Sequence, residues 1–143
     1  MRAIWQTGQV VGLDAMVFIY YMEHRGLRNS VDNLFDEIYK GRLGAVVSTI
    51  IFTEIYPPLS AKRIDLLDCY RDFFAMFSNK IKIFDVTRPI AEYAAILRGR
   101  HKIRTPDAIH LATAIDQGAD FFVTHDRQLK KVKEISVITL KDL

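Results

Sequence analysis

Hydrophobic residues in this chain gather in short runs that alternate with longer segments of helical spacing. Apolar runs rich in β-branched and aromatic residues predict five strands, in residues 10–14, 45–49, 80–86, 120–124 and 135–140. Between them, apolar residues three or four positions apart predict amphipathic helices, in residues 31–40, 62–77, 89–98 and 105–117. A further helix begins near Ile51, and we expect it to bend or restart at Pro57-Pro58.

Strands that alternate with helices are typical of α/β domains, because parallel strands need the crossover connections that helices supply. We therefore expect a three-layer α/β/α architecture with a mainly parallel central sheet of about five strands. The chain has 143 residues, which is the length of one ordinary domain. Residues 1–143 are expected to form a single domain.

Composition excludes several classes of protein. Half of the residues are hydrophobic and 26% are charged, which excludes intrinsic disorder. A single cysteine excludes an internal disulfide framework and a cysteine-rich zinc site. The longest apolar run, Ala15 to Met22, is too short to span a bilayer, and the N-terminus lacks the apolar stretch of a secretory signal. We expect a cytoplasmic protein that does not associate with membranes.

Positive charge is concentrated in two windows, although the net charge of the chain is only +3. Each window holds four basic residues and no acid: Arg98, Arg100, Lys102 and Arg104 in the first, and Arg127, Lys130, Lys131 and Lys133 in the second. Such windows suit either a solvated surface or a surface that attracts a polyanion. Their neighbours in the sequence help to distinguish these alternatives.

Four acids stand where a parallel sheet places its ligands, outside the carboxyl ends of the strands. Asp14 ends the first predicted strand, Glu54 lies just beyond the second, Asp126 lies beyond the fourth, and Asp107 is in the first turn of helix 105–117. Each one alone also suits a cap, a turn or a surface position. Asp14 and Asp107, however, lie in apolar sequence, where an unpaired carboxylate is costly.

Together the four acids predict a site for Mg²⁺ or Mn²⁺, which prefer oxygen ligands. The two basic windows directly precede Asp107 and directly follow Asp126. This arrangement favours a nucleic-acid substrate over a small phosphorylated metabolite, which would need fewer positive charges.

The segments that carry these acids resemble the PIN domain family. The most specific are Thr105-Pro106-Asp107-Ala108 and Val123-Thr124-His125-Asp126, and the resemblance also includes Leu13-Asp14 and Ser48-Thr49 with Glu54. It covers nearly the whole chain in the same order and spacing. The length is also close to that of VapC-like toxins, which are single PIN domains.

The resemblance implies a divalent-metal-dependent endoribonuclease that hydrolyses RNA phosphodiester bonds with a metal-activated water. Such proteins are often the toxin of a type II toxin–antitoxin pair and often homodimers, so the implied partners are RNA, a cognate antitoxin protein and a second copy of the chain. The implied metal-binding and catalytic residues are Asp14, Glu54, Asp107 and Asp126. The implied substrate contacts are Thr124, Arg104 and Arg127.

One departure from the family pattern leaves an alternative open. PIN domains usually carry hydroxyl or amide side chains directly after the first acid, whereas this chain has Ala15 and Met16. The orientation of Asp14 could be looser as a result, and the chain could be a catalytically weak or inactive PIN domain that binds RNA or protein. A haloacid-dehalogenase phosphatase fits less well, since its second Asp would stand where Met16 is, and a receiver domain lacks its acidic pair.

Three further residues are assigned structural roles. Cys69 lies in the apolar stripe of helix 62–77 and is expected in the core rather than as a nucleophile. His110 shares a helix face with Asp107, and a structural role is favoured over substrate contact. Tyr20 is expected in the core or at a dimer interface rather than as a platform for a base.

Overall fold

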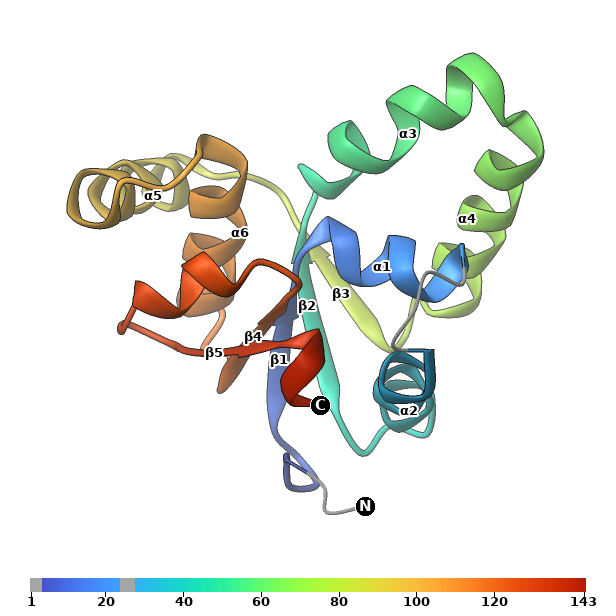
Figure 1. Cartoon of the computed structure of the whole chain (residues 1–143), viewed down its shortest axis with the longest axis horizontal. Coiled ribbons are helices and arrows are strands. Elements are labelled where there is room, and N and C mark those ends of the chain that lie inside the picture. The colour runs from blue at the N-terminus through green and yellow to red at the C-terminus, as the bar shows by residue number, and fades with distance from the viewer. Residues whose placement is uncertain (1–3, 24–27) are drawn as a thin grey trace.

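A five-stranded sheet, in which all neighbouring strands are parallel, forms the centre of the molecule (Figure 1). The computed structural model describes residues 4–23 and 28–143, with the backbone alone at residues 28 and 57–61. The strand order is β3-β2-β1-β4-β5. The strands are β1 (Val10–Leu13), β2 (Gly44–Ser48), β3 (Ile81–Phe84), β4 (Phe121–Thr124) and β5 (Ser136–Thr139).

Helices cover both faces of this sheet, so the expected three-layer α/β/α architecture is confirmed. One face is covered by α6 (Thr105–Asp116), with α5 (Arg88–His101) packed against it. The opposite layer consists of α1 (Ala15–Met22), α2 (Arg28–Tyr39), α3 (Ile51–Lys62) and α4 (Ile64–Met76). Short 3-10 helices follow β4 and β5, namely η1 (Arg127–Lys131) and η2 (Leu140–Asp142).

The hydrophobic core has one part on each side of the sheet. The part beneath α1–α4 is rich in aromatic rings, and Phe73 alone contacts five others, those of Phe18, Tyr21, Phe35, Phe74 and Phe77. The part beneath α5 and α6 has one buried aromatic ring, that of Phe122, and otherwise consists of aliphatic side chains and four alanines, at positions 94, 108, 112 and 114. A Cβ atom on Gly12 of β1 would lie 2.5 Å from the Cβ of Ala114, so α6 packs directly on the strand backbone.

Two helices differ from the sequence expectation. Residues 15–22 form α1, which the uniformly apolar run did not reveal because it lacks a polar face. The chain does not restart at Pro57-Pro58: α3 continues to Lys62, and the break falls at Arg63, whose backbone is not helical. Ile51 and Ile55 are buried and anchor the first turns of α3 in the core, which offsets the cost of the prolines.

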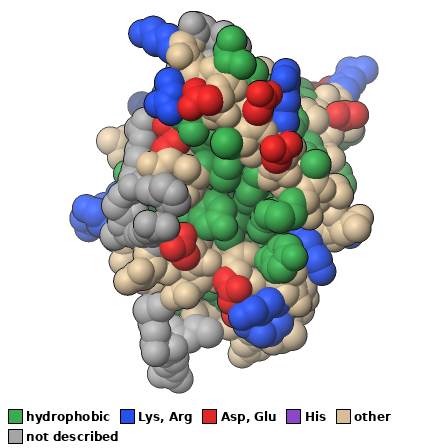
Figure 2. Space-filling view, turned by 90° about the vertical axis from the view of Figure 1, so that its right-hand side faces the viewer, with side chains coloured by type: hydrophobic (Ala, Val, Ile, Leu, Met, Phe, Trp, Pro, Cys, Tyr) green, Lys and Arg blue, Asp and Glu red, His purple; other side chains and the backbone are tan. Residues whose placement is uncertain are grey.

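Hydrophobic side chains also gather on the outer face of the α1–α4 layer, with acidic side chains among them (Figure 2). A pocket there has a volume of about 420 Å³ and is lined by Tyr21, Phe35, Tyr39, Met76 and Phe77, together with Asp32 and Asp36. In the described part of the chain, no helix is both long and apolar enough to cross a bilayer.

Candidate active site

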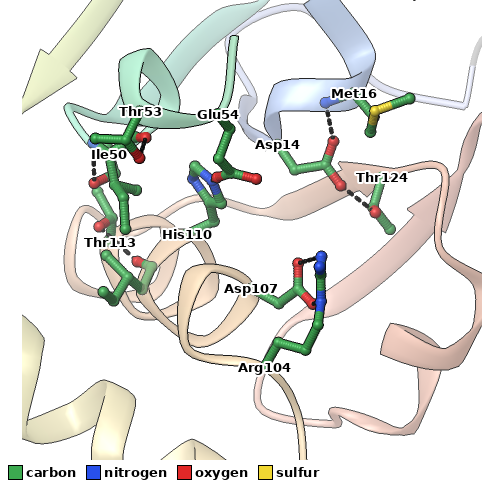
Figure 3. A network of polar contacts seen from close by, with 12 residues as sticks. Asp14, Met16, Ile50, Thr53, Glu54, Arg104, Asp107, His110, Thr113 and Thr124 are labelled. Carbon is green, nitrogen blue, oxygen red and sulfur yellow. Dashed lines mark hydrogen bonds and ion pairs between the residues drawn. The ribbon is translucent and has the colours of Figure 1, made fainter. Parts of the chain in front are cut away.

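Asp14 lies directly after β1 and caps the N-terminus of α1. Its carboxylate accepts hydrogen bonds from the backbone amides of Met16, at 2.9 Å, and Val17, at 3.3 Å, and from the hydroxyl of Thr124 (Figure 3). None of these donors requires a polar side chain at position 15 or 16. The side chain is therefore oriented by the backbone and by β4, despite the departure from the family pattern at those positions.

The Asp14 side chain is buried, with 5% of the residue exposed. Burial raises the pKa of its carboxyl, and the hydrogen bond from Thr124 and the charges of His110 and His125 only partly oppose this effect. Because a buried carboxylate is stabilised by nearby positive charge, this position is electrostatically suited to a bound cation.

Glu54 extends from the first turn of α3 toward the same region and is paired with a histidine of α6. Its Oε1 atom is hydrogen-bonded to Nε2 of His110, which is buried. Among the described residues, Nδ1 of His110 has no hydrogen-bond partner. Nε2 therefore makes the imidazole's only hydrogen bond to the described chain, and it fixes the direction of the Glu54 carboxylate.

Asp107 lies in the first turn of α6 and forms a two-pronged ion pair with Arg104. Nε of Arg104 donates to Oδ2 at 3.1 Å, and Nη2 donates to Oδ1 at 3.3 Å. The hydrogen bond to Asp107 raises the pKa of the guanidinium, and the charges of Glu54 and Asp126 act in the same direction. The Arg104 side chain is 72% exposed and that of Asp107 only 10%, so the arginine covers the acid from the solvent side.

Asp126 follows β4 and caps η1 by accepting a hydrogen bond from the amide of Gln128 at 2.9 Å. Its own amide donates to Oγ1 of Thr124 at 3.0 Å. Thr124 is fully buried and links Asp126 to Asp14. The residue predicted to contact substrate therefore bonds to two of the predicted acids instead.

A pocket of about 100 Å³ lies beside Asp107 and Asp126 and is lined by residues of both basic windows. Lys102 and Arg104 line it from the first window, and Lys131 lines it from the second. Lys102 has a φ of 53°, the only positive φ among the described residues other than glycine. This left-handed backbone ends α5 and turns the chain toward α6.

The structure brings the predicted acids to the carboxyl edge of the sheet. Asp14, Glu54 and Asp107 lie around a common space in Figure 3, and Asp126 lines the pocket that also contains Asp107. In the part of the chain that the structure describes, no three Asp, Glu, His or Cys side chains are close enough to enclose a metal ion. Glu54 and Asp107 are instead turned toward His110 and Arg104.

The donor set nevertheless suits Mg²⁺ or Mn²⁺ in its chemistry, because it consists of carboxylate oxygens, one of them deeply buried. Another acid near the strands, Asp120, bonds to the amide of Val10 at 2.8 Å. It therefore stabilises the opposite, amino-terminal edge of the sheet.

Two histidines of the site were not assigned to it from the sequence. The i, i+3 spacing of Asp107 and His110 on one helix was the signal for the first. His125 lies between Thr124 and Asp126, and its charge acts on Asp14. Its position in the motif was visible, but its proximity to Asp14 depends on the pairing of β4 with β1.

The family model described as PIN domain matches residues 11–135, which is most of the chain. The chain belongs to the PIN domain family. A comparison with curated protein sequences finds no significant match.

Solved structures share the fold of this PIN domain. VapBC2 from Rickettsia felis, bound to a DNA fragment from its promoter, matches with a TM-score of 0.74 and 18% identity over 92% of this chain and 98% of that chain. A toxin–antitoxin complex from Klebsiella pneumoniae matches with a TM-score of 0.69 and 20% identity over 95% of this chain and 100% of that one. VapBC from Salmonella typhimurium, bound to DNA, matches with a TM-score of 0.72 and 14% identity over 92% and 98%.

Proposed function

We propose that this PIN domain is a divalent-metal-dependent endoribonuclease and the toxin of a type II toxin–antitoxin pair. The observation that carries the proposal is the placement of Asp14, Glu54 and Asp107 around one space at the carboxyl edge of the sheet (Figure 3). Asp14 and Asp107 are buried, and buried carboxylates are costly for a fold unless positive charge compensates them, which a bound cation would do.

Mg²⁺ or Mn²⁺ is the proposed cofactor, with Asp14, Glu54, Asp107 and Asp126 as its holding residues. When bound, such an ion lowers the pKa of a water and stabilises charge on phosphoryl oxygens. Thr124 and the amides of Met16 and Val17 hold the Asp14 carboxylate in place. His110 does the same for Glu54.

Arg104 has a double role in this proposal. In the structure it neutralises Asp107 and lies within reach of the charges of Glu54 and Asp126. Because its side chain is mostly exposed, it is free to turn from Asp107 to a substrate phosphate. Lys102 and Lys131 then supply the remaining positive charge of the pocket for the RNA backbone.

An antitoxin protein is the proposed physiological partner. The support comes from the similar structures, one of which is described as a toxin–antitoxin complex and others as VapBC bound to DNA. The apolar pocket between α2 and α4, with Asp32 and Asp36 at its rim, is the kind of exposed surface that marks a protein contact. A homodimer is proposed on the family resemblance alone, and equilibrium sedimentation of the purified chain tests it.

The test of the nuclease proposal is cleavage of mixed RNA by the purified chain in Mg²⁺ or Mn²⁺, with and without EDTA. We expect cleavage that EDTA abolishes and that Asp14→Asn and Asp107→Asn each lower about a hundredfold or more. Asp120→Asn is the matched control, because this acid belongs to the opposite edge of the sheet. Equal cleavage by all three variants would refute the proposed site.

The second candidate is a PIN domain that binds RNA without cleaving it, and the specific observation behind it is Ala15 and Met16 beside Asp14. It predicts RNA binding with no cleavage in any divalent ion. The three hydrogen bonds that orient Asp14 without side chains from those positions favour the enzyme.

A further inference from the structure

The segment that follows β4 lines two pockets, the one beside Asp107 and Asp126 described above and a second one. Gln128 and Asp126 face the pocket already described, whereas His125 and Arg127 line the other, which has a volume of about 130 Å³. Its remaining wall comes from Tyr20 of α1 and from Thr139, Leu140 and Lys141 at the end of β5. None of the proposed metal ligands lines this second pocket. Of the residues that do line it, only Arg127 was predicted from the sequence to contact substrate.

The second pocket lies at the same edge of the sheet as the acids. Thr139 is paired in register with Thr124, whose hydroxyl bonds to Asp14. Tyr20 belongs to the helix that Asp14 caps, and the charge of His125 acts on the Asp14 carboxyl. The pocket therefore borders the acids at the edge of the sheet where the RNA is proposed to bind.

The lining combines two rings with two cations. The rings of Tyr20 and His125 lie 6.3 Å apart between centroids and are tilted by 35°. His125 is exposed, and Tyr20 is partly buried against the aromatic core, which supports it from behind. Within residues 4–23 and 28–143, neither Arg127 nor Lys141 forms an ion pair with an acid.

Aromatic rings beside unpaired cations match the chemistry of a nucleotide. A nucleobase has a flat face that packs on aromatic side chains, and its phosphates are held by arginine and lysine. A free phosphate would not need the rings, and an apolar ligand would not need the cations. The neighbouring Lys130, by contrast, is held by Asp142 at 2.7 Å and is not available to a phosphate.

We propose that this pocket is a nucleotide subsite, in which one base of single-stranded RNA packs on Tyr20 and His125 while Arg127 and Lys141 hold the flanking phosphates. The inference rests on the proposed ribonuclease function and deepens it, because it names the part of the substrate that the protein holds beside the acids. The sequence favoured a core or dimer-interface role for Tyr20, which does pack against the core, and its partly exposed side chain also lines this pocket.

The test compares two RNA probes of equal charge, hexauridylate and a hexamer of abasic ribose phosphates. Binding is measured by fluorescence anisotropy in Mg²⁺, with the full chain carrying Asp107→Asn to prevent cleavage. We expect the base-containing probe to bind about tenfold more tightly or better, since stacking of one base gives an effect of that order. Tyr20→Leu and His125→Gln should remove this preference, whereas Tyr20→Phe, which keeps the ring, should retain it.

The cations should behave differently from the rings. The double variant Arg127→Ala, Lys141→Ala should weaken both probes alike and reduce the salt dependence of binding. The variant Arg71→Ala, Lys82→Ala removes the same charge outside the pocket and outside both basic windows, and should weaken binding of the two probes much less. His125 is exposed, so His125→Gln remains informative even if Tyr20→Leu fails to fold.

The outcomes separate the two proposals. If metal-dependent cleavage is observed but Tyr20→Leu and His125→Gln keep the preference for the base-containing probe, the subsite is refuted and the nuclease is not. Equal affinity of the parent for both probes would likewise refute the subsite and leave the nuclease proposal standing. If the parent neither cleaves nor binds RNA, the proposed function fails and the subsite fails with it.

Discussion

The layer of α1–α4 covers its face of the sheet with large rings, whereas α6 buries alanines against the other face, and Ala114 lies against the backbone of Gly12. The contact between Ala114 and Gly12 leaves almost no room for α6 to move closer or to accept a larger side chain. The residues of the candidate site are drawn from both layers, with Asp14 and Glu54 on the first and Asp107 and His110 on the second. The comparison suggests that the alanine layer fixes the height of α6 at the sheet edge, and that the aromatic layer mainly supplies stability.

The largest effect is expected from Phe73→Ala in the aromatic layer. Phe73 is almost completely buried among five rings, and loss of a buried phenyl group costs about 3–5 kcal/mol of the free energy of unfolding. Urea denaturation measures this loss. The control is Ile64→Ala on the same helix, where the residue is 66% exposed and the change should stay within about 0.5 kcal/mol.

Gly12→Ala is expected to cost less stability than Phe73→Ala. For an equal loss of stability, however, it is expected to lower RNA cleavage more than a change in the aromatic layer does. The added Cβ would be 2.5 Å from Ala114 and 3.0 Å from Phe122, so α6 must move, at a cost of about 1–3 kcal/mol. Gly99→Ala on α5 is the control, because open space surrounds it and a gain of about 0.4–1 kcal/mol is expected. If Gly12→Ala loses no more RNA cleavage than Phe73→Leu of equal stability, the alanine layer does not position the site.

Asp14→Asn, at the edge of the sheet, is expected to raise the free energy of unfolding, whereas the two preceding variants lower it. Because burial raises the pKa of this carboxyl in the folded chain, the folded state binds the proton more tightly, and ionisation destabilises the fold. The cost is absent below the unfolded pKa of about 3.8 and is complete above the folded pKa. In EDTA at pH 7, Asp14→Asn should therefore be more stable than the parent by about 1 kcal/mol.

Thermal unfolding at two pH values checks this prediction. The difference should disappear near pH 3, and added Mg²⁺ should stabilise the parent but not the variant. Lower stability of Asp14→Asn at pH 7 in EDTA would show that its hydrogen bonds outweigh the burial of its charge.

The smallest effect is expected at Asp142, an exposed residue in η2. Its carboxylate accepts hydrogen bonds from Lys130 and from the amide and hydroxyl of Thr139, which lower its pKa to about 2. Its side chain is 41% exposed, so solvent screens the pair and Asp142→Asn should cost at most about 1 kcal/mol at pH 7. This contribution is present above pH 3.8 and is lost as the pH falls toward 2. Asp68→Asn, in a looser surface pair with Arg71, should change nothing measurable.

Much of the fold could be predicted because its signals are local. The five strands and the helices at 31–40, 62–77, 89–98 and 105–117 follow from apolar spacing, and all have counterparts in the structure. The helix of residues 15–22 was missed since it is apolar on every side, and strand β3 is shorter than the expected 80–86. Cys69 was expected in the core but is exposed on α4, because Leu67, Tyr70 and Phe73 form the buried stripe instead.

The acids of the candidate site could be located from the ends of strands, but their contacts could not. The hydrogen bond of His110 with Glu54 joins residues 56 positions apart and depends on side-chain directions that no spacing rule gives. The burial of Thr124 is likewise a result of tertiary packing between β1 and β5.

The hydrogen bond between Thr124 and Asp14 joins residues 110 positions apart in the chain. During translation, β1 and the acid that follows it leave the ribosome long before β4 is synthesised. The hydrogen bond from Thr124 can therefore orient Asp14 only after the chain has been synthesised as far as β4, and until then the acid lacks its side-chain partner.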